Sequence, residues 1–534
     1  MRCDVIGCTL LAVSLLPGLG DATVLRVPEQ YATIQMALDT LAEGDTVLVA
    51  PGNYYEALLA PVHSFALTGI VDSLSDPNRP LVDPSPLDGS RHLTCMTLSP
   101  HDVRIEDFIF RNGPEMYPRE QPATVGGVLK NGANLTLTNC LFDSTFIGLR
   151  SDYPTSGLNV TNCDFRDNAA LCLKDLSTEH VSIRGTSFSG SGNVLVWVAD
   201  SAVIDSCTFH DVTGFGEWLW PIGRAITVRN CEFGPSLVRM NAAIWAGDSR
   251  GCHLENNLFH DLEVSAGVVQ VLGMPGDTTF FDGNVFSHCR GDYALLGGGG
   301  ISLDGQGGPM NVAISNSTFD SCTAPHNMGY GAIVAGQASS VMSDNHFNGH
   351  NIPAPTVRFV FSPNTTLHQC TFERTGWAMS ADTDWYNPDS VWHISAEDNW
   401  WGDPSGPRHS ILNPTGLGDS IVGPVNFSPW LTEDPLSSPK PRGLFPSGFV
   451  LESYPEPFNL EVRLKLTVAD PGRYKLELFD LLGRRVREIW EGSVVFDREV
   501  SFSTDNLASG VYFACATESS SRLPVVTTKL VLLK

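Results

Sequence analysis

Apolar and polar residues alternate in short runs along most of the chain, and a phenylalanine ends almost every run. These phenylalanines recur at intervals of 21 to 33 residues. They are Phe110, Phe142, Phe165, Phe188, Phe209, Phe233, Phe259, Phe286, Phe319, Phe347 and Phe372, and Trp400 closes the series. Alternation with period two predicts half-buried strands. A repeat of this length predicts the stacked coils of a solenoid.

A second strand is predicted behind the polar turn that follows each phenylalanine. Residues 147–150, 171–174, 194–197 and 242–245 are such runs. Two or more strands per coil are typical of a parallel β-helix, and the general preference of parallel crossovers predicts a right-handed one. We therefore predict an all-β fold with a right-handed parallel β-helix over residues 23–432.

Cysteine or asparagine occupies the position two residues before many of the phenylalanines. The set is Cys140, Cys163, Cys207, Cys231 and Cys370, with Asn257, Asn284 and Asn345. Stacked coils would place these side chains about 4.8 Å apart, where asparagine amides hydrogen-bond along the stack and cysteine acts as a small hydrophobe. No CxxC pair occurs, so we assign the cysteines to the core rather than to a metal or redox site. Whether neighbouring cysteines pair stays open.

The N-terminal region contains the one amphipathic helix of the prediction, over residues 33–41. Its apolar stripe predicts a cap on the first coil, and Gly44 ends it. Residues 1–22 have the features of a signal peptide: Arg2, an apolar run, and small residues ending at Ala22. An uncleaved N-terminal strand is the alternative. No later segment reaches the roughly 18 apolar residues of a transmembrane helix.

Two stretches resemble the bacterial pectin-lyase-like β-helix proteins. The first joins residues 31–35 (YATIQ) with 44–56 (GDTVLVAPGNYYE), and the second joins 398–407 (DNWWGDPSGP) with 422–431 (VGPVNFSPWL). The resemblance covers about residues 23–432 and implies the fold. Because this group includes lyases, glycosidases, esterases, epimerases and non-catalytic surface proteins, the resemblance implies no single activity.

The last segment, residues 450–534, resembles the C-terminal sorting domain of type IX-secreted bacterial proteins. The matching stretches are YPEPFN (454–459), LFDLLGR (478–484), LASGVYF (507–513) and KLVLLK (529–534), although the family usually has Asn where Glu456 stands. The resemblance implies a small immunoglobulin-like β-sandwich, recognition by the secretion machinery, and a location outside the cell or on the outer-membrane surface of a bacterium. A linker over residues 433–449, rich in Ser and Pro, separates the two domains.

The net charge of −26 restricts the classes of ligand. A phosphate backbone needs a basic surface, so the charge argues against nucleic acid. It also argues against polyanionic sugars, unless a local basic patch or a bound cation intervenes. The sequence contains no calcium-binding nonapeptide repeat, and we predict no cofactor, with Ca²⁺ left open.

One face of the second strand is the predicted ligand groove. By period two, the residue after each inward apolar residue points outward, which gives the column Arg150, Lys174, Trp197, Trp245 and Gln270. Tryptophan can stack on sugar rings, and arginine and lysine can hold carboxylates or sulfates. An insertion over residues 210–224 adds Trp218, Trp220 and Arg224, and Asp248 supplies an acid close by. The alternative is that Trp218 and Trp220 only form a lateral hydrophobic cover.

Two classes of function stay open. The favoured one is a secreted or surface protein that binds polysaccharide or a cell-surface glycan, as an adhesin or scaffold, because no known catalytic set is intact. The other is a carbohydrate-active enzyme. A lyase would use Lys174 or Arg150 to abstract a proton or neutralise a carboxylate, and a hydrolase would need two carboxylates around one bond.

Overall fold

The structure is a computed structural model, and a large part of the chain is described in it. The described residues are 22–532 except 72–77, 89–92, 112–126, 133, 152–154, 169–170, 191–192, 212–216, 237–239, 248–250, 274–277, 292–297, 306–309, 325–330, 350–353, 363, 383–393, 436–449, 455–457, 459–460, 469–471, 481–483, 495–496, 504–506 and 519–523. The predicted signal peptide and most of the linker therefore lie outside the described residues.

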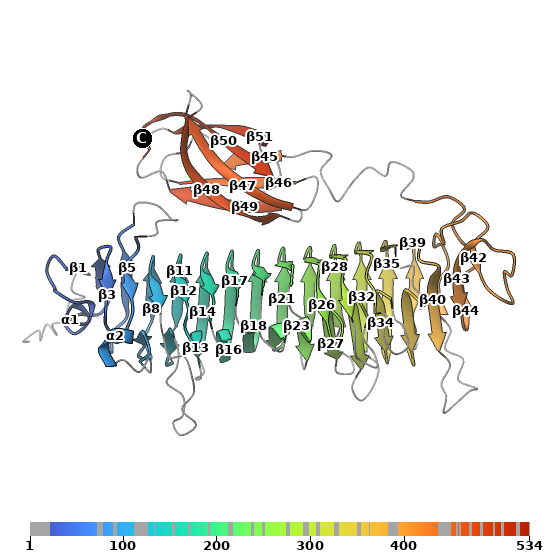
Figure 1. Cartoon of the computed structure of the whole chain (residues 1–534), viewed down its shortest axis with the longest axis horizontal. Helices are drawn as coiled ribbons and strands as arrows, with labels where there is room; N and C mark the ends of the chain where they lie inside the picture. Colours follow the sequence, from blue (N-terminus) through green and yellow to red (C-terminus); the bar gives the residue numbers. More distant parts are fainter. Residues whose placement is uncertain are drawn as a thin grey trace, which may run out of the picture.

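The long domain is a parallel β-helix whose coils lie side by side along one axis (Figure 1). Each coil carries three strands, which form three parallel sheets that we call A, B and C in chain order. A coil of 21 to 33 residues therefore has three corners, one after each strand. The single strand predicted before each phenylalanine is in fact two strands. For example, β11 (Leu135–Thr138) belongs to sheet A and β12 (Leu141–Asp143) to sheet B, with Asn139 at the corner between them.

Sheet A contains β1 (Val24–Val27), β2 (Thr46–Val49), β5 (Phe65–Gly69), β8 (Val103–Glu106), β11, β14 (Thr155–Thr161), β21 (Ala225–Arg229), β24 (Cys252–Glu255), β28 (Thr278–Asp282), β32 (Met310–Ser315), β35 (Ala338–Ser343), β38 (Thr366–His368), β41 (Ile394–Ser395) and β44 (Val425–Asn426). Sheet B contains β3 (Asn53–Tyr54), β6 (Leu81–Val82), β9 (Ile109–Arg111), β12, β15 (Asp164–Arg166), β17 (Ser187–Ser189), β19 (Thr208–His210), β22 (Glu232–Phe233), β25 (Leu258–His260), β29 (Val285–Ser287), β33 (Thr318–Asp320), β36 (His346–Asn348) and β39 (Thr371–Glu373).

Sheet C contains β4 (Leu58–Leu59), β7 (Met96–Thr97), β10 (Val128–Lys130), β13 (Ile147–Ser151), β20 (Glu217–Ile222), β23 (Ala242–Gly247), β27 (Val269–Gly273), β31 (Ile301–Gly305), β34 (Ile333–Gly336), β37 (Val357–Val360), β40 (Trp377–Asp382), β42 (Pro407–Arg408) and β43 (Gly418–Val422). Two long strands, β16 (Leu171–Arg184) and β18 (Asn193–Asp205), run from sheet C into sheet A. A short pair, β26 (Glu263–Val264) and β30 (Arg290–Gly291), lies between sheets B and C in chain order.

The phenylalanines form one continuous stack inside the β-helix. From Phe110 to Phe372, neighbouring ring centroids are 4.5 to 5.3 Å apart. The stack ends at Trp401, whose ring lies 4.9 Å from that of Phe372, so the prediction that Trp400 closes the series is wrong. Trp401 is the residue in phase because Asn399, two positions before it, accepts a hydrogen bond from the backbone of Cys370 at 2.8 Å.

The cysteines and asparagines two positions before the stacked rings are buried, as predicted. Asn257 Nδ2 donates to Asn284 Oδ1 in the next coil at 3.0 Å and to Val228 O at 2.9 Å. The ladder cysteines are buried free thiols, and burial raises the pKa of Cys370 to about 12. The asparagines therefore satisfy hydrogen-bonding groups inside the core, and the cysteines fill it. The described cysteines at this position form no disulfide.

A left-handed residue makes the A–B corner in coil after coil. It lies three positions before the stacked aromatic ring, with φ between 50° and 65° in Asp107, Asn139, Asn162, Gly185, Ser206, Asn230, Asn256, Gly283, Asn316, Asp344, Gln369 and Asp398. Only glycine adopts this conformation freely, and asparagine and aspartate tolerate it better than other residues do. The polar residue that we read from the sequence as part of a strand is therefore the corner itself.

The N-terminal helix α1 (Ile34–Leu38) is shorter than predicted. Thr33 caps it, and Ile34, Ala37 and Leu38 are buried in the same core cluster as the first coils. The carboxylate of Glu56 accepts hydrogen bonds from the backbone of Ile34 and Gln35, both at 2.9 Å. A second short helix, α2 (Ser85–Asp88), follows β6. Among the described helices none is long and apolar enough to cross a membrane.

The C-terminal domain is a sandwich of two antiparallel sheets with a separate hydrophobic core. One sheet is β45 (Val450–Tyr454), β46 (Glu461–Thr467) and β49 (Asp497–Ser503), and the other is β48 (Arg485–Val494), β47 (Gly472–Asp480), β50 (Gly510–Glu518) and β51 (Pro524–Leu532). Tyr474, Leu476 and Leu478 alternate into the core from β47. Because this core is separate from that of the β-helix, each domain buries its own apolar side chains.

Candidate functional site

The outer face of sheet C is where the sequence places the ligand groove. Backbone pairing puts Arg150 beside Lys174, Lys174 beside Leu195, and Leu195 beside Trp220. Trp220 lies in register with Trp245, which pairs with Gln270. The outward column therefore reads Arg150, Lys174, Leu195, Trp220, Trp245 and Gln270, and each step along it is one coil, about 4.8 Å.

Trp197 does not belong to this column, so that part of the prediction is wrong. It pairs with Leu176 and Ile222 instead, two residues further along the strand. A register shift next to Cys172 moves the pairing, so that Leu173 meets Val194 rather than Val196. A slip of two residues keeps the same alternation, since Val194 and Val196 are both buried, and the sequence pattern cannot reveal it. Trp197 instead lies in a second outward column, between Leu176 and Ile222.

The segment read as an insertion provides the sheet C strand of its own coil, β20. Trp218 is 1% exposed and packs in the core, so it belongs neither to the groove nor to a lateral cover. Trp220 stacks on Trp245 with ring centroids 5.1 Å apart and an interplanar angle of 6°. Each indole therefore covers one face of the other, and Leu195 and Gln270 are the next residues of the column on the two outer sides. Both rings are half-buried.

Trp197 is the most open tryptophan of this face, with half of its surface (51%) exposed. Ile222 and Leu272 lie in the same outward column and are half-buried. Together with Leu195, Trp220 and Trp245, these residues form an apolar area on the outer face of the sheet, which we call the sheet C patch. Contiguous exposed apolar areas are typical of binding surfaces.

The predicted cations lie at one end of the sheet C patch but differ in exposure. Arg150 is only 5% exposed, whereas Lys174 is half-buried. Arg224 is exposed and follows β20 at the turn into sheet A, away from the column. The predicted Asp248 lies outside the described residues. Lys174 is thus the predicted cation that combines accessibility with a place in the column.

At its other end the outer face of sheet C is covered. Gln270 pairs with Ser302, whose Oγ accepts a hydrogen bond from the Gly298 backbone at 2.9 Å. Val334, next in the column, is fully buried against Ala324. The accessible part of the column therefore runs from Lys174 to Gln270.

A buried polar cluster lies beneath the cationic end of this face. Lys130, Ser151 and Asp175 are in register on the inward side of sheet C and are fully buried. Lys130 Nζ lies 3.9 Å from Asp175 Oδ1, and Thr178 Oγ1 donates to the same oxygen at 2.7 Å. Asp175 follows the outward Lys174 directly but points into the core. The sequence analysis missed this cluster, although a lysine at an inward position of an alternating strand was its signal.

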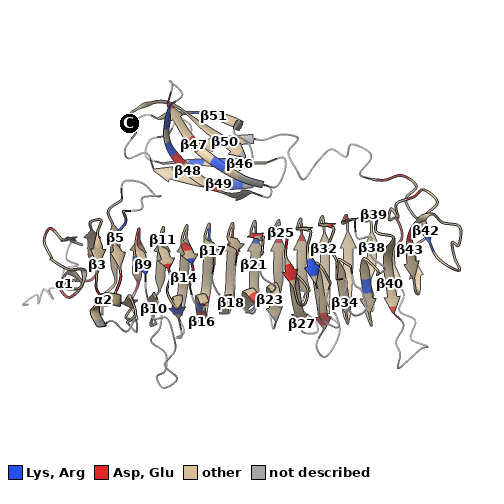
Figure 2. Ribbon diagram, in the orientation of Figure 1, with Lys and Arg blue, Asp and Glu red and all other residues tan. Residues whose placement is uncertain are grey.

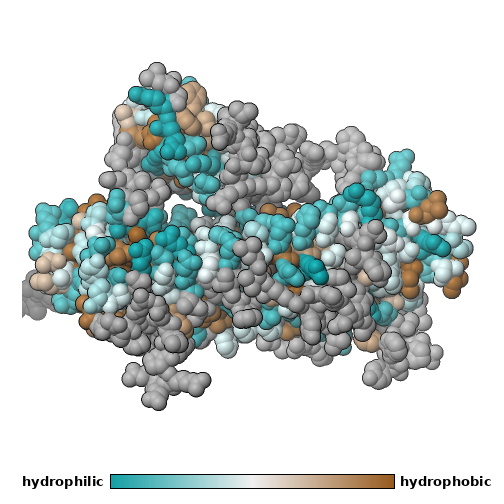
Figure 3. Space-filling model, viewed as in Figure 1, coloured by the Kyte–Doolittle hydropathy of each residue, from teal (hydrophilic) through white to brown (hydrophobic). Residues whose placement is uncertain are grey.

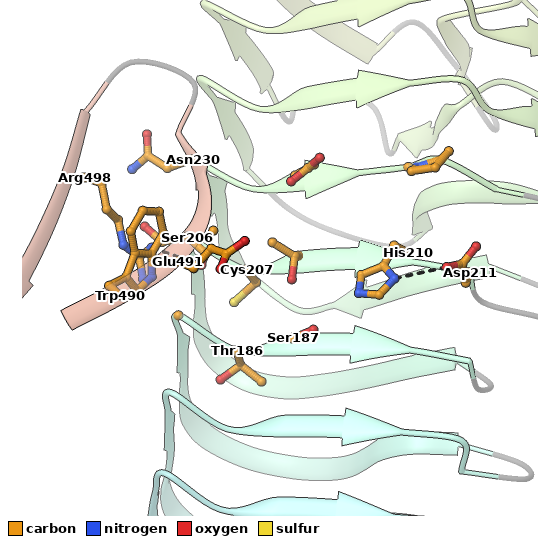
Figure 4. Close-up of a pocket in the computed structure, with 16 residues that line it drawn as sticks. Thr186, Ser187, Ser206, Cys207, His210, Asp211, Asn230, Trp490, Glu491 and Arg498 are labelled. Atoms are coloured by element: carbon orange, nitrogen blue, oxygen red, sulfur yellow. Dashed lines mark hydrogen bonds and ion pairs between the residues drawn. The ribbon is translucent and has the colours of Figure 1, made fainter. Parts of the chain in front are cut away.

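Two clefts between the domains were not predicted from the sequence, and Figure 4 shows one of them. The sandwich lies alongside the middle coils (Figure 1), and Arg498 and Trp490 face the A–B corner. The clefts have volumes of about 430 and 770 Å³ and share Gly185, Ser206, Asn230, Trp490, Glu491 and Arg498 in their walls. No sequence signal connects residues so distant along the chain.

Charge is sparse on the sheets of the β-helix, where most of the ribbon carries neither acid nor base (Figure 2). On the face shown in Figure 3, hydrophobic areas are small and separated by hydrophilic ones. Within the described part of the chain, no group of three His, Cys, Asp or Glu side chains is arranged to hold a metal ion.

Comparison with known protein families gives two matches. The family described as "right handed beta helix region" matches residues 100–259 and 218–384, together more than half of the chain. The family described as "secretion system C-terminal sorting domain" matches residues 452–532. The two matches confirm the predicted parallel β-helix and the predicted sorting domain. No curated protein matches the chain.

Among solved structures, the chain is similar to PfbA, a surface adhesin of Streptococcus pneumoniae, with 13% identity, a TM-score of 0.31, and coverage of 70% of this chain and 87% of that one. An alginate lyase from Paenibacillus sp. matches with 11% identity, a TM-score of 0.22, and coverage of 76% and 99%. The A-module of the mannuronan C-5 epimerase AlgE6 of Azotobacter vinelandii matches with 12% identity, a TM-score of 0.27, and coverage of 74% and 94%.

Proposed function

Since the chain belongs to the right-handed β-helix family and ends in a secretion system C-terminal sorting domain, we propose that it is a secreted polysaccharide-binding protein of a bacterial surface. The ligand lies along the outer face of sheet C, parallel to the axis of the β-helix. The single observation that carries this proposal is the sheet C patch, in which Trp197 is half exposed beside the stacked pair Trp220 and Trp245.

The chemistry of the face suits an extended sugar chain. Trp197 offers an open indole, and the ring edges of the stacked pair Trp220 and Trp245 offer further apolar contact. Lys174 lies two coils from Trp220, about 10 Å along the axis, and can pair with a carboxylate or sulfate of the same chain. The overall charge of −26 favours polymers with few acidic groups over densely charged ones.

Binding is favoured over catalysis because the acid next to Lys174 is unavailable to a ligand. Asp175 is fully buried and turned into the core, where it faces Lys130. A hydrolase needs two accessible carboxylates around one bond. The alternative that stays testable is a lyase in which Lys174 abstracts the proton.

A binding panel tests the proposal. The secreted protein is measured against immobilised plant and algal polysaccharides as wild type, Trp197→Ala and Trp245→Ala, with Phe280→Ala as the matched control. Phe280 is an exposed aromatic residue of sheet A (39%), away from the sheet C patch. We expect each tryptophan variant to lose about tenfold in affinity, close to 1.4 kcal/mol, and the control to bind like wild type.

Two outcomes would count against the proposal. Equal binding by wild type and both tryptophan variants would remove the sheet C patch from the site. Release of unsaturated products by wild type, abolished in Lys174→Ala, would replace the binding function with a lyase activity.

A further inference from the structure

Arg498 of the sorting domain inserts its side chain at the A–B corner of the β-helix. The residue is only 9% exposed, although it belongs to strand β49 of the sandwich. Its Nη1 donates a hydrogen bond to the backbone oxygen of Ser206 at 3.1 Å. Its guanidinium carbon lies 5.1 Å from the centre of the Trp490 ring, within the range of a cation–π contact. Figure 4 shows Arg498 and Trp490 together beside Ser206 and Asn230.

The corner receives Arg498 where one coil lacks a side chain. Gly185 occupies the left-handed position that Asn162 fills in the preceding coil. A Cβ atom built on Gly185 would lie 2.9 Å from Arg498 Nη2 and 2.5 Å from Asn162 Oδ1. The guanidinium group of Arg498 therefore occupies the space that a side chain at position 185 would fill.

One carboxylate at the corner, that of Asp205, acts on the Arg498 cation and also pairs with Arg229, whose Nη2 lies 2.9 Å from Asp205 Oδ2. Asp205 lies at the end of β18, next to Ser206. Burial lowers the pKa of Arg498, and the charge of Asp205 opposes that effect. An arginine is effectively always protonated in proteins, so a buried one needs such a partner surface.

From these contacts we infer that the notch at Gly185 is a docking site on the β-helix for the sorting domain of the same chain. The docked sandwich covers the A–B corner and leaves the sheet C patch open. The interface is a tethered one, in which the linker keeps the local concentration of the partner high, so a small contact area is enough to hold the domain. The two clefts beside Arg498 agree with a contact of this limited kind.

The β-helix itself offers a matched pair of variants. Gly185→Asn places in the notch the residue found most often at this corner in the other coils, and asparagine tolerates the positive φ of 57°. Gly283→Asn makes the same change at the equivalent corner of another coil, where φ is 65° and a Cβ would lie 2.3 Å from Asn256 Oδ1. The two variants carry the same local strain, but only Gly185 contacts the sandwich.

Small-angle X-ray scattering of the full chain tests the inference, with Arg498→Gln as a third variant. We expect wild type and Gly283→Asn to give the profile of one compact particle. Gly185→Asn and Arg498→Gln should give a larger radius of gyration and a longer maximum dimension, with unchanged circular dichroism. An extended wild type, a Gly185→Asn profile equal to wild type, or undocking only in Gly283→Asn would overturn the inference. Polysaccharide binding, measured in parallel, is expected to stay unchanged in all three variants.

Discussion

Lys130 Nζ lies 3.9 Å from Asp175 Oδ1 inside the β-helix, and neither side chain is exposed to solvent. Thr178 Oγ1 joins them, because it accepts a hydrogen bond from Lys130 at 3.1 Å and donates one to Asp175 at 2.7 Å. Burial lowers the pKa of Lys130 to about 8 against the opposing effect of Asp175, and burial raises the pKa of Asp175. A core made of stacked apolar rings thus contains a buried charged cluster whose members depend on one another.

Removing one member of this cluster should be costly. In Asp175→Leu, the buried amine of Lys130 loses its counter-charge, and we expect the free energy of unfolding to fall by about 3–5 kcal/mol. The double variant Lys130→Met/Asp175→Leu removes both charges and should lose clearly less. Thermal unfolding followed by calorimetry gives the comparison. Equal losses in the single and double variants would show that the two residues do not act as a pair.

The phenylalanine stack predicts a large effect of a single truncation. Phe209 packs between Phe188 at 4.9 Å and Phe233 at 4.5 Å. Phe209→Ala leaves a cavity between these rings and should lower stability by about 3–5 kcal/mol. The control is Phe280→Ala on the surface of sheet A, which should change stability by less than about 0.5 kcal/mol. Similar unfolding temperatures for the two variants would contradict the role assigned to the stack.

His260 makes stability depend on pH. Burial by itself would lower its pKa, but hydrogen bonds to Glu232 and Asp261, at 3.0 Å each, outweigh burial and raise it. A group with a raised pKa in the folded state stabilises the protein below its unfolded pKa, about 6.5, and this stabilisation is lost as the pH rises through the folded value. We therefore expect His260→Gln to be less stable than wild type at pH 5.5 and to approach wild type at pH 9. A stability difference that grows with rising pH would refute this assignment.

The corner position of each coil should accept only some residues. Asn256 has a φ of 51° at the A–B corner. Asn256→Gly keeps access to the left-handed conformation and should be close to wild type, whereas Asn256→Val places a β-branched residue there and should cost roughly 1–2 kcal/mol. Chemical denaturation of the two variants gives the measurement. If valine were tolerated as well as glycine, the corner would not depend on backbone conformation.

The spacing of the phenylalanines was enough to predict the fold, because one ring per coil has to stack on the next. It placed Phe372 correctly but ended the series one residue early, at Trp400 rather than Trp401. The reason is that two tryptophans stand side by side, and their phase is distinguished by the corner at Asp398 and by the hydrogen bond that Asn399 accepts from the Cys370 backbone. The spacing of the rings therefore predicts where each coil lies along the chain, but it does not predict which residue ends the stack.

The site could be predicted only in part. Arg150, Lys174, Trp245 and Gln270 do share one outward column, because each follows an inward apolar residue. Trp197 was placed wrongly, since a shift of two residues preserves alternation and leaves no trace in the pattern. The contact of Arg498 with Ser206 spans 292 positions and depends on the relative placement of two domains, which no local pattern encodes.

The repeated corner has a consequence for how proteins of this kind change length. From Asp107 to Asp398, each coil begins and ends at a left-handed residue three positions before a stacked ring, so a segment from one corner to the next is a self-consistent module. Deleting residues 140–162 would join Asn139 to Cys163 and keep rings, ladder and corners in phase. Gene segments could thus be lost or duplicated in whole coils, each changing the length of the outer faces by about 4.8 Å without new side-chain chemistry.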